Sequence, residues 1–124
     1  HSSCNLTEQV RDIVYKSGIQ QGMVFIFFRH TTGAIILVEH EAGFIVDLEE
    51  TLERLVPRSL EFKHHMRDYD QNGRSHVLAS LLNTTVSVPF HNGDLLLGTY
   101  QDIFVIDFQA EPKSREVIVQ IIGE

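Results

Sequence analysis

Histidine is the side chain whose number and placement in this sequence most clearly indicate chemistry. The chain has seven histidines in 124 residues. His30 follows an apolar run, and His64 and His76 stand at the two ends of a long polar stretch. Neutral imidazole is the commonest side-chain metal ligand and a natural acid or base near pH 7. We therefore expect these three to converge on one divalent metal ion, zinc or magnesium, or on the phosphate group of a small molecule.

Asp70 and Asn72 lie between two of these histidines and add oxygen donors to the expected site. Such groups either complete a metal shell or orient a ligating imidazole from outside it. The spacing matches no zinc finger, no His-Glu-x-x-His helix and no cysteine pair, so the site requires residues distant in sequence to converge. The alternative interpretation is that His64 and His76 are solvated loop histidines.

His76 has a second feature, which favours an anion. Ser75 is predicted to cap a helix that continues to Leu82, and this places His76 in the first turn of that helix. Unpaired backbone N–H groups and the helix dipole attract negative charge there. A phosphate-bearing substrate could therefore dock beside this imidazole.

Charge and composition exclude several partners. The net charge of −7 repels phosphate backbones and anionic lipid, so we expect neither nucleic acid nor a membrane as a partner. The longest apolar run, Met23–Phe28, is far shorter than the ~20 residues of a membrane span, and no signal peptide is recognised. The single cysteine, Cys4, fits a reducing compartment, and we expect a cytoplasmic protein. Glycine-rich phosphate loops, dinucleotide-binding fingerprints and serine nucleophile elbows do not occur in the sequence.

Hydrophobic periodicity predicts the elements that position these residues. Three amphipathic helices are expected, from Asn5 (with Glu8 three residues on) to Gly18, from Phe44 to Pro57, and from Ser75 to Leu82. Six strands are expected: Met23–Phe28 (covered on both faces), Ala34–Val38, Thr85–Phe90, Leu95–Tyr100, Ile103–Phe108 and Glu116–Ile122. We predict a single α+β domain over residues 1–124, with small helices on a mainly antiparallel sheet and a C-terminal β-meander.

These segments together resemble the YjbQ family, whose founding member is described as a secondary thiamine-phosphate synthase. The matching strings span residues 5–124 in order and with matching spacing. They are His30-Thr31-Thr32, Glu39, Leu55-Val56-Pro57, His64, Asp70-x-Asn72-Gly73-x-x-His76, Gly93 to Gly98-Thr99-Tyr100-Gln101 and Gln120-Ile121-Ile122-Gly123-Glu124.

The resemblance implies a small subunit that assembles as a homotrimer, with the histidine cluster lining a polar pocket near subunit contacts. It also implies weak synthesis of thiamine phosphate from a pyrimidine diphosphate and a thiazole phosphate, with a divalent metal. Family members begin with one or two strands ahead of the first helix, so we expect native strands before His1. The rim of the site departs from the family pattern at Val38, His40, His65, Tyr100 and Asp107.

Three residues outside the histidine cluster are candidates for contacting the ligand. Glu39 closes a predicted strand, and its carboxylate either faces the same cleft as His30 or is a solvated surface charge. Thr31 and Gln101 belong to the matching strings, and the resemblance implies that they help to bind the ligand.

Three functions remain open from the sequence. The first is an enzyme in which His64 and His76 act as ligands or as general acid and base, with His30 beside them and Asp70 and Asn72 orienting the set. The second is a non-catalytic oligomeric module that holds a metal or phosphate without turnover. The third is an assembly subunit whose long loop is merely polar.

Overall fold

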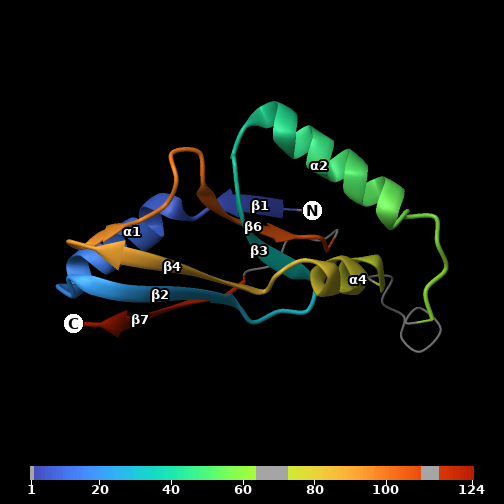
Figure 1. Cartoon of the computed structure of the whole chain (residues 1–124). Helices are drawn as coiled ribbons and strands as arrows, with labels where there is room; N and C mark the ends of the chain where they lie inside the picture. Colours follow the sequence, from blue (N-terminus) through green and yellow to red (C-terminus); the bar gives the residue numbers. More distant parts are fainter. Residues whose placement is uncertain (1, 64–72, 110–114) are drawn as a thin grey trace.

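The computed structural model describes residues 2–63, 73–109 and 115–124. Its strands form two antiparallel sheets, and within these ranges three helices pack against them (Figure 1). The first sheet has the order β1 (Ser2–Asn5), β6 (Asp102–Asp107), β3 (Gly33–Val38). The second has the order β5 (Asp94–Leu95), β4 (Thr85–His91), β2 (Gln21–Phe28), β7 (Val117–Gly123). The predicted α+β class with mainly antiparallel strands is confirmed. None of the described helices is long and apolar enough to cross a membrane.

Strand β2 is apolar from Met23 to Phe28, but only one of its faces is buried. Val24, Ile26 and Phe28 point inward and are at most 2% exposed, whereas Phe25 and Phe27 are 37% and 42% exposed. The prediction that both faces are covered is therefore wrong for the single chain. The physical reason is that helix α1 (Thr7–Ser17) and the first sheet pack on the inner face only.

Helix α1 forms where the spacing of its apolar residues predicts it. Val10 and Val14 are buried in the core shared by the two sheets, and the helix ends at Gly18, whose φ of 75° is left-handed. Its start differs from the expected capping box, because Asn5 is the last residue of β1. The Asn5 Oδ1 atom instead accepts hydrogen bonds from the Thr7 N–H at 3.0 Å and the Thr7 hydroxyl at 2.7 Å. This turn joins β1 to α1.

A second core lies between the first sheet and helices α2 (Ala42–Leu55) and α4 (Gly73–Leu81). Helix α2 begins two residues before the predicted Phe44, because the Glu41 carboxylate accepts hydrogen bonds from the Gly43 and Phe44 N–H groups, both at 2.8 Å. Both bonds lower the pKa of Glu41, and the bond from Gly43 has the larger effect. The helix ends before Pro57, as predicted.

Helix α4 is fastened to the end of α2 by Arg74. Its Nε donates to the Val56 carbonyl at 2.7 Å, and its guanidinium lies 3.4 Å from the Glu53 carboxylate. The prediction that Ser75 caps this helix is wrong, since the helix begins at Gly73 and Ser75 is a buried residue inside it. The chain can bury Ser75 there because its small side chain lets the helix pack closely.

The C-terminal strands are divided between the two sheets, so a simple meander does not form. The hairpin at Asn92-Gly93 joins β4 to β5 with positive φ at both residues, as the Asn-Gly signal predicts. The predicted strand Leu95–Tyr100 is wrong beyond Leu95, because the chain leaves the second sheet there and arches across to the first. Strand β6 then pairs with β1 and β3, and β7 returns to pair with β2.

Candidate functional site

The turn between β2 and β3 places His30 at the end of a buried strand, as the sequence predicts. The imidazole is half-buried and tilts against Phe28, with 4.9 Å between ring centroids. Its Nε2 accepts a hydrogen bond at 3.2 Å from the backbone N–H of Glu116, the residue directly before β7. Thr31 is exposed in the same turn. The contacts with the Phe28 ring and the Glu116 backbone therefore fix the orientation of the His30 ring.

A buried ion pair lies beneath this turn. The Asp107 carboxylate accepts a hydrogen bond from Arg115 Nε at 2.6 Å, from the Thr32 hydroxyl at 3.0 Å and from the Gln109 N–H at 3.0 Å. Arg115 also donates to the side chain of Gln109. The Asp107 and Arg115 side chains are only 7% and 20% exposed.

These contacts decide the ionisation of Asp107. Burial alone raises the pKa of this carboxyl, but the hydrogen bonds from Arg115, Gln109 and Thr32 outweigh it, so the pKa lies below its ordinary value. The carboxylate is therefore charged at neutral pH and holds Arg115 and Thr32 in place.

Sequence reasoning missed this network. From the sequence, Asp107 was noted only as a departure from the family pattern and was not predicted to form an ion pair. A usable signal was present, because Asp107 is the one acidic residue within the apolar run Ile103–Phe108, and Arg115 lies two residues before the apolar run that starts at Val117. A charge at the end of a buried strand requires a partner of opposite sign.

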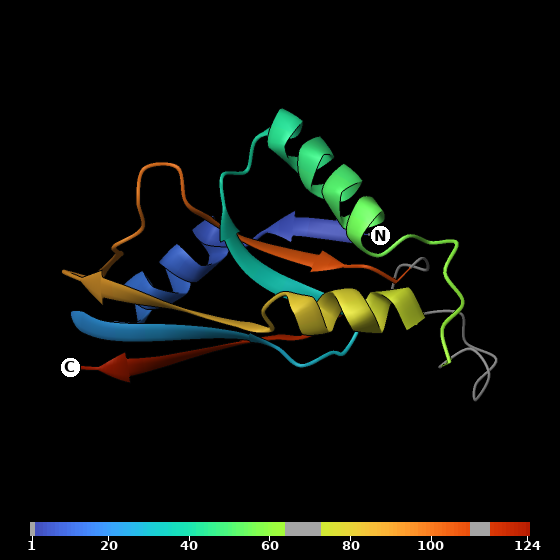
Figure 2. The same cartoon turned by 45° about the vertical axis from the view of Figure 1, so that its right-hand side comes forward.

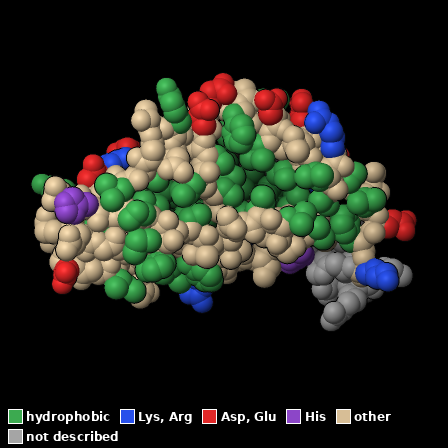
Figure 3. Space-filling model, in the orientation of Figure 1, with side chains coloured by type: hydrophobic (Ala, Val, Ile, Leu, Met, Phe, Trp, Pro, Cys, Tyr) green, Lys and Arg blue, Asp and Glu red, His purple; other side chains and the backbone are tan. Residues whose placement is uncertain are grey.

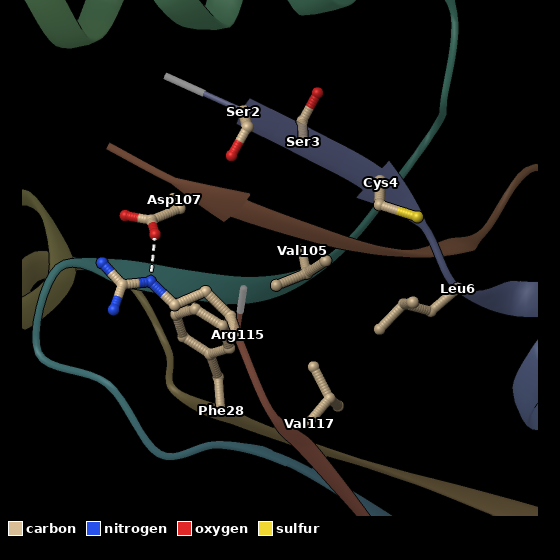
Figure 4. Close-up of a pocket in the computed structure, with 9 residues that line it drawn as sticks. All are labelled: Ser2, Ser3, Cys4, Leu6, Phe28, Val105, Asp107, Arg115 and Val117. Atoms are coloured by element: carbon tan, nitrogen blue, oxygen red, sulfur yellow. Dashed lines mark hydrogen bonds and ion pairs between the residues drawn. The ribbon is translucent and has the colours of Figure 1, made fainter. Parts of the chain in front are cut away.

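A pocket of about 360 Å³ lies beside the ion pair, between the first sheet and the start of β7 (Figure 4). Its apolar lining is formed by Leu6, Phe28, Val105 and Val117. Ser2 and Ser3 of β1 also line it, and the Asp107–Arg115 pair stands at one end. The exposed Cys4 lies on its edge. The pocket shares Phe28 with the surroundings of His30, although His30 is not part of its lining.

His76 is half-buried and lies on α4, a helix that packs against β3 (Figure 2). Because the helix begins at Gly73, His76 is its fourth residue, rather than the residue next to a Ser75 cap. The segment after α4 is bonded to both strands that flank the His30 turn: the Asn83 and Thr84 carbonyls accept from Ile35 N at 2.7 Å and Phe28 N at 2.8 Å. The C-terminal end of α4, the helix that bears His76, is thereby fixed beside the strands that flank the His30 turn.

The other residues expected at the centre of the site, His64, Asp70 and Asn72, lie outside the described residues. Their convergence with His30 and His76 stays a prediction. Within residues 2–63, 73–109 and 115–124, no group of three or more histidine, cysteine, aspartate or glutamate side chains is placed to hold a metal ion.

Glu39 and Gln101 lie at the other end of the first sheet from His30. Glu39 is exposed directly after β3, and Gln101 precedes β6, whose first residue pairs with the last residue of β3. The Gln101 side chain accepts from the Gly98 N–H at 2.9 Å and shapes the arch. Strand β3 has 6 residues, so its two ends are about 20 Å apart. A single chain therefore does not bring Glu39 and Gln101 into a common cleft with His30.

The sequence matches a family model, described as "UPF0047 protein YjbQ-like", over residues 1–124. A UPF0047 protein of Methanothermobacter thermautotrophicus is 35% identical over 120 residues, which are 97% of this chain and 82% of that protein. One from Archaeoglobus fulgidus is 36% identical over 118 residues, covering 95% of this chain and 89% of that protein.

Solved structures show the same fold. A YbjQ-like protein of unknown function from Sulfolobus solfataricus superposes with a TM-score of 0.93 at 34% identity, covering 99% of this chain and 88% of that one. A yjbq/upf0047 family protein from Clostridium acetobutylicum gives a TM-score of 0.87 at 30% identity, covering 98% of this chain and 91% of that one. The names of these relatives state no activity.

Proposed function

Since this chain belongs to the YjbQ/UPF0047 family, we propose that it is a cytoplasmic small-molecule enzyme whose histidine-lined pocket binds a phosphorylated ligand. The observation that carries the proposal is the fastening of α4, which bears His76, to the strands that flank the turn that bears His30. Two imidazoles from distant parts of the sequence are thereby held on adjoining elements. His64, Asp70 and Asn72 belong to the chain segment directly before α4 and are proposed to complete the pocket.

The reaction class proposed from the family resemblance is thiamine-phosphate synthesis. A thiazole nitrogen forms a bond to the carbon of the pyrimidine that carries the diphosphate, the carbon–oxygen bond breaks, and pyrophosphate leaves with the bonding electrons. Most of the rate would come from positioning the two reactants and from stabilising phosphate charge. Imidazole N–H groups can supply such stabilisation without a protein nucleophile.

A divalent metal ion, zinc or magnesium, is proposed as a cofactor with His64 and His76 as ligands. His30, expected from the sequence as a third ligand, instead has its Nε2 engaged by the Glu116 N–H. When bound, it would neutralise phosphate charge. Asp70 and Asn72 would orient the ligating imidazoles.

Calorimetry with inorganic phosphate, zinc and magnesium between pH 5.5 and 8 tests the site. If a metal binds, its affinity should fall below about pH 6.5, because protonated imidazole does not coordinate. Phosphate held by imidazolium should instead bind more tightly as the pH falls over this range. His30→Gln and His76→Gln should each weaken binding, whereas His91→Gln, a matched change of an exposed histidine at the far end of β4, should leave binding unchanged. Equal binding by all three variants would contradict the proposed site.

Turnover separates the enzyme from a binding module. The protein mixed with the pyrimidine diphosphate and the thiazole phosphate should release pyrophosphate and form thiamine phosphate. Tight binding of both substrates without release of pyrophosphate would favour a non-catalytic metal- or phosphate-binding module.

Self-association as a homotrimer is part of the same proposal. The outer face of the second sheet exposes Phe25, Phe27, Ile118 and Ile122, and β7 is an edge strand of that sheet. Hydrophobic side chains also lie exposed over much of the face seen in Figure 3, while acidic ones gather along α2. Closed cyclic symmetry covers such surfaces and edges. It could also bring Glu39 and Gln101 of one subunit to the His30 of another.

Light scattering at micromolar concentration should accordingly return about three times the mass of one chain. We expect this mass because association of three chains would bury the exposed apolar face of β2 and β7. Phe27→Glu should shift the mass towards that of a monomer, while Glu124→Gln should not. A mass of one chain for the unmodified protein would contradict the proposal.

A further inference from the structure

The contact between His30 and Glu116 determines which ring nitrogen of His30 carries the proton. A backbone N–H can only donate, and the Glu116 N–H points at His30 Nε2 at 3.2 Å. Nε2 must therefore supply its lone pair to this hydrogen bond. In the neutral imidazole the proton is then on Nδ1, which becomes a hydrogen-bond donor.

This tautomer suits an anionic oxygen and opposes a metal ion. Coordination requires a free lone pair, and the lone pair on Nε2 is already used by the Glu116 N–H. Coordination through Nδ1 would move the proton to Nε2, where two N–H groups would face each other across the present hydrogen bond. A phosphate or carboxylate oxygen, by contrast, accepts directly from Nδ1–H.

The Glu116 N–H is held in place by contacts on both sides. Its neighbour Arg115 is fixed by Asp107, and the Thr32 hydroxyl, from the same turn as His30, binds that same carboxylate. On the other side, the Glu116 carboxylate lies 3.5 Å from the Arg29 guanidinium. These contacts join the turn to the residues directly before β7.

We propose that His30 acts as an N–H donor from Nδ1 to an anionic oxygen of the ligand, with its tautomer set by the Glu116 N–H and the ion pair beneath it. This deepens the proposed function and rests on it: His30 recognises a phosphate oxygen and is not a metal ligand. Any metal ion in the pocket would be held without His30. The Asp107–Arg115 pair is a positioning pair that acts through Glu116.

Nitrogen-15 NMR of the imidazole rings tests this directly, with the His30 signals assigned by their loss in His30→Gln. The free protein should show a protonated Nδ1 and an unprotonated Nε2 for His30. Added inorganic phosphate should shift the Nδ1 resonance, and added zinc should leave both His30 resonances in place.

Glu116→Pro removes the backbone N–H, and Glu116→Ala keeps it. The proline variant should lose the preference for the Nδ1–H tautomer, whereas the alanine variant should retain it. If the proline variant does not fold, the tautomer of the unmodified protein alone decides the matter.

The outcomes separate this inference from the proposed function. Phosphate binding with His30 protonated on Nε2, or zinc coordination by His30, overturns the inference and leaves the proposed pocket standing. Absence of phosphate binding with His30 protonated on Nδ1 overturns the proposed function and the donor role together. Phosphate binding that shifts the Nδ1 resonance supports both.

Discussion

Replacing Asp107 by asparagine should lower the free energy of unfolding by about 3 kcal/mol at pH 7, because it leaves the largely buried Arg115 guanidinium without its carboxylate. Urea unfolding measures this difference. Asp12→Asn is the matched control, since the Asp12–Lys16 ion pair is exposed and its loss should change the free energy by no more than about 0.5 kcal/mol.

The effect of Asp107→Asn should also depend on pH. The fold lowers the pKa of Asp107, so the stability that this carboxylate contributes is complete above about pH 4, the pKa of aspartate in an unfolded chain. It is lost as the pH falls through the lower pKa of the folded state. The difference between the two proteins should therefore shrink below about pH 4. A difference that stays constant down to pH 2 would contradict this role of Asp107.

His76→Ala and Leu78→Ala should have opposite consequences, although both change the same helix. Leu78 is fully buried in the second core, so its truncation should cost about 2–5 kcal/mol by opening a cavity. His76 is half-buried near the start of α4, and we expect its truncation to abolish phosphate or metal binding while costing less than about 1 kcal/mol.

Urea unfolding and calorimetry on the two variants measure this contrast between scaffold and site. Leu78→Ala should bind normally at temperatures where it remains folded. If His76→Ala unfolds the protein, or folds and binds as well as the unmodified chain, His76 is a structural residue and the proposed site is wrong.

Local patterns in the sequence predict the elements better than their arrangement. The spacing of Val10 and Val14 before Gly18 predicts α1, and Asn92-Gly93 predicts a hairpin that needs positive φ. The run from Leu95 to Tyr100 has the composition of a strand, yet the chain uses most of it to cross between sheets. Composition reports which residues favour extended backbone, and it does not report which strand will pair with which.

The candidate site was predictable only where it depends on local patterns in the sequence. The sequence shows His30 directly after an apolar run. It also shows that one predicted strand separates His30 from Glu39, and this places the two residues at opposite ends of that strand. The Asp107 network was not predictable as a unit, because Thr32, Asp107 and Arg115 come from three separate segments. Only the pairing of β3 with β6 and of β2 with β7 brings them together.

A crystal structure of the protein grown with inorganic phosphate and zinc tests the central claim most directly, because that claim concerns convergence. We expect the imidazoles of His30, His64 and His76 to surround one bound phosphate group, with His30 contacting an oxygen through Nδ1. Any zinc ion should lie on His64 and His76, at about 2 Å from their nitrogens. Imidazoles separated by more than roughly 10 Å, with no ion between them, would contradict the account, since neither a phosphate group nor a metal ion bridges that distance.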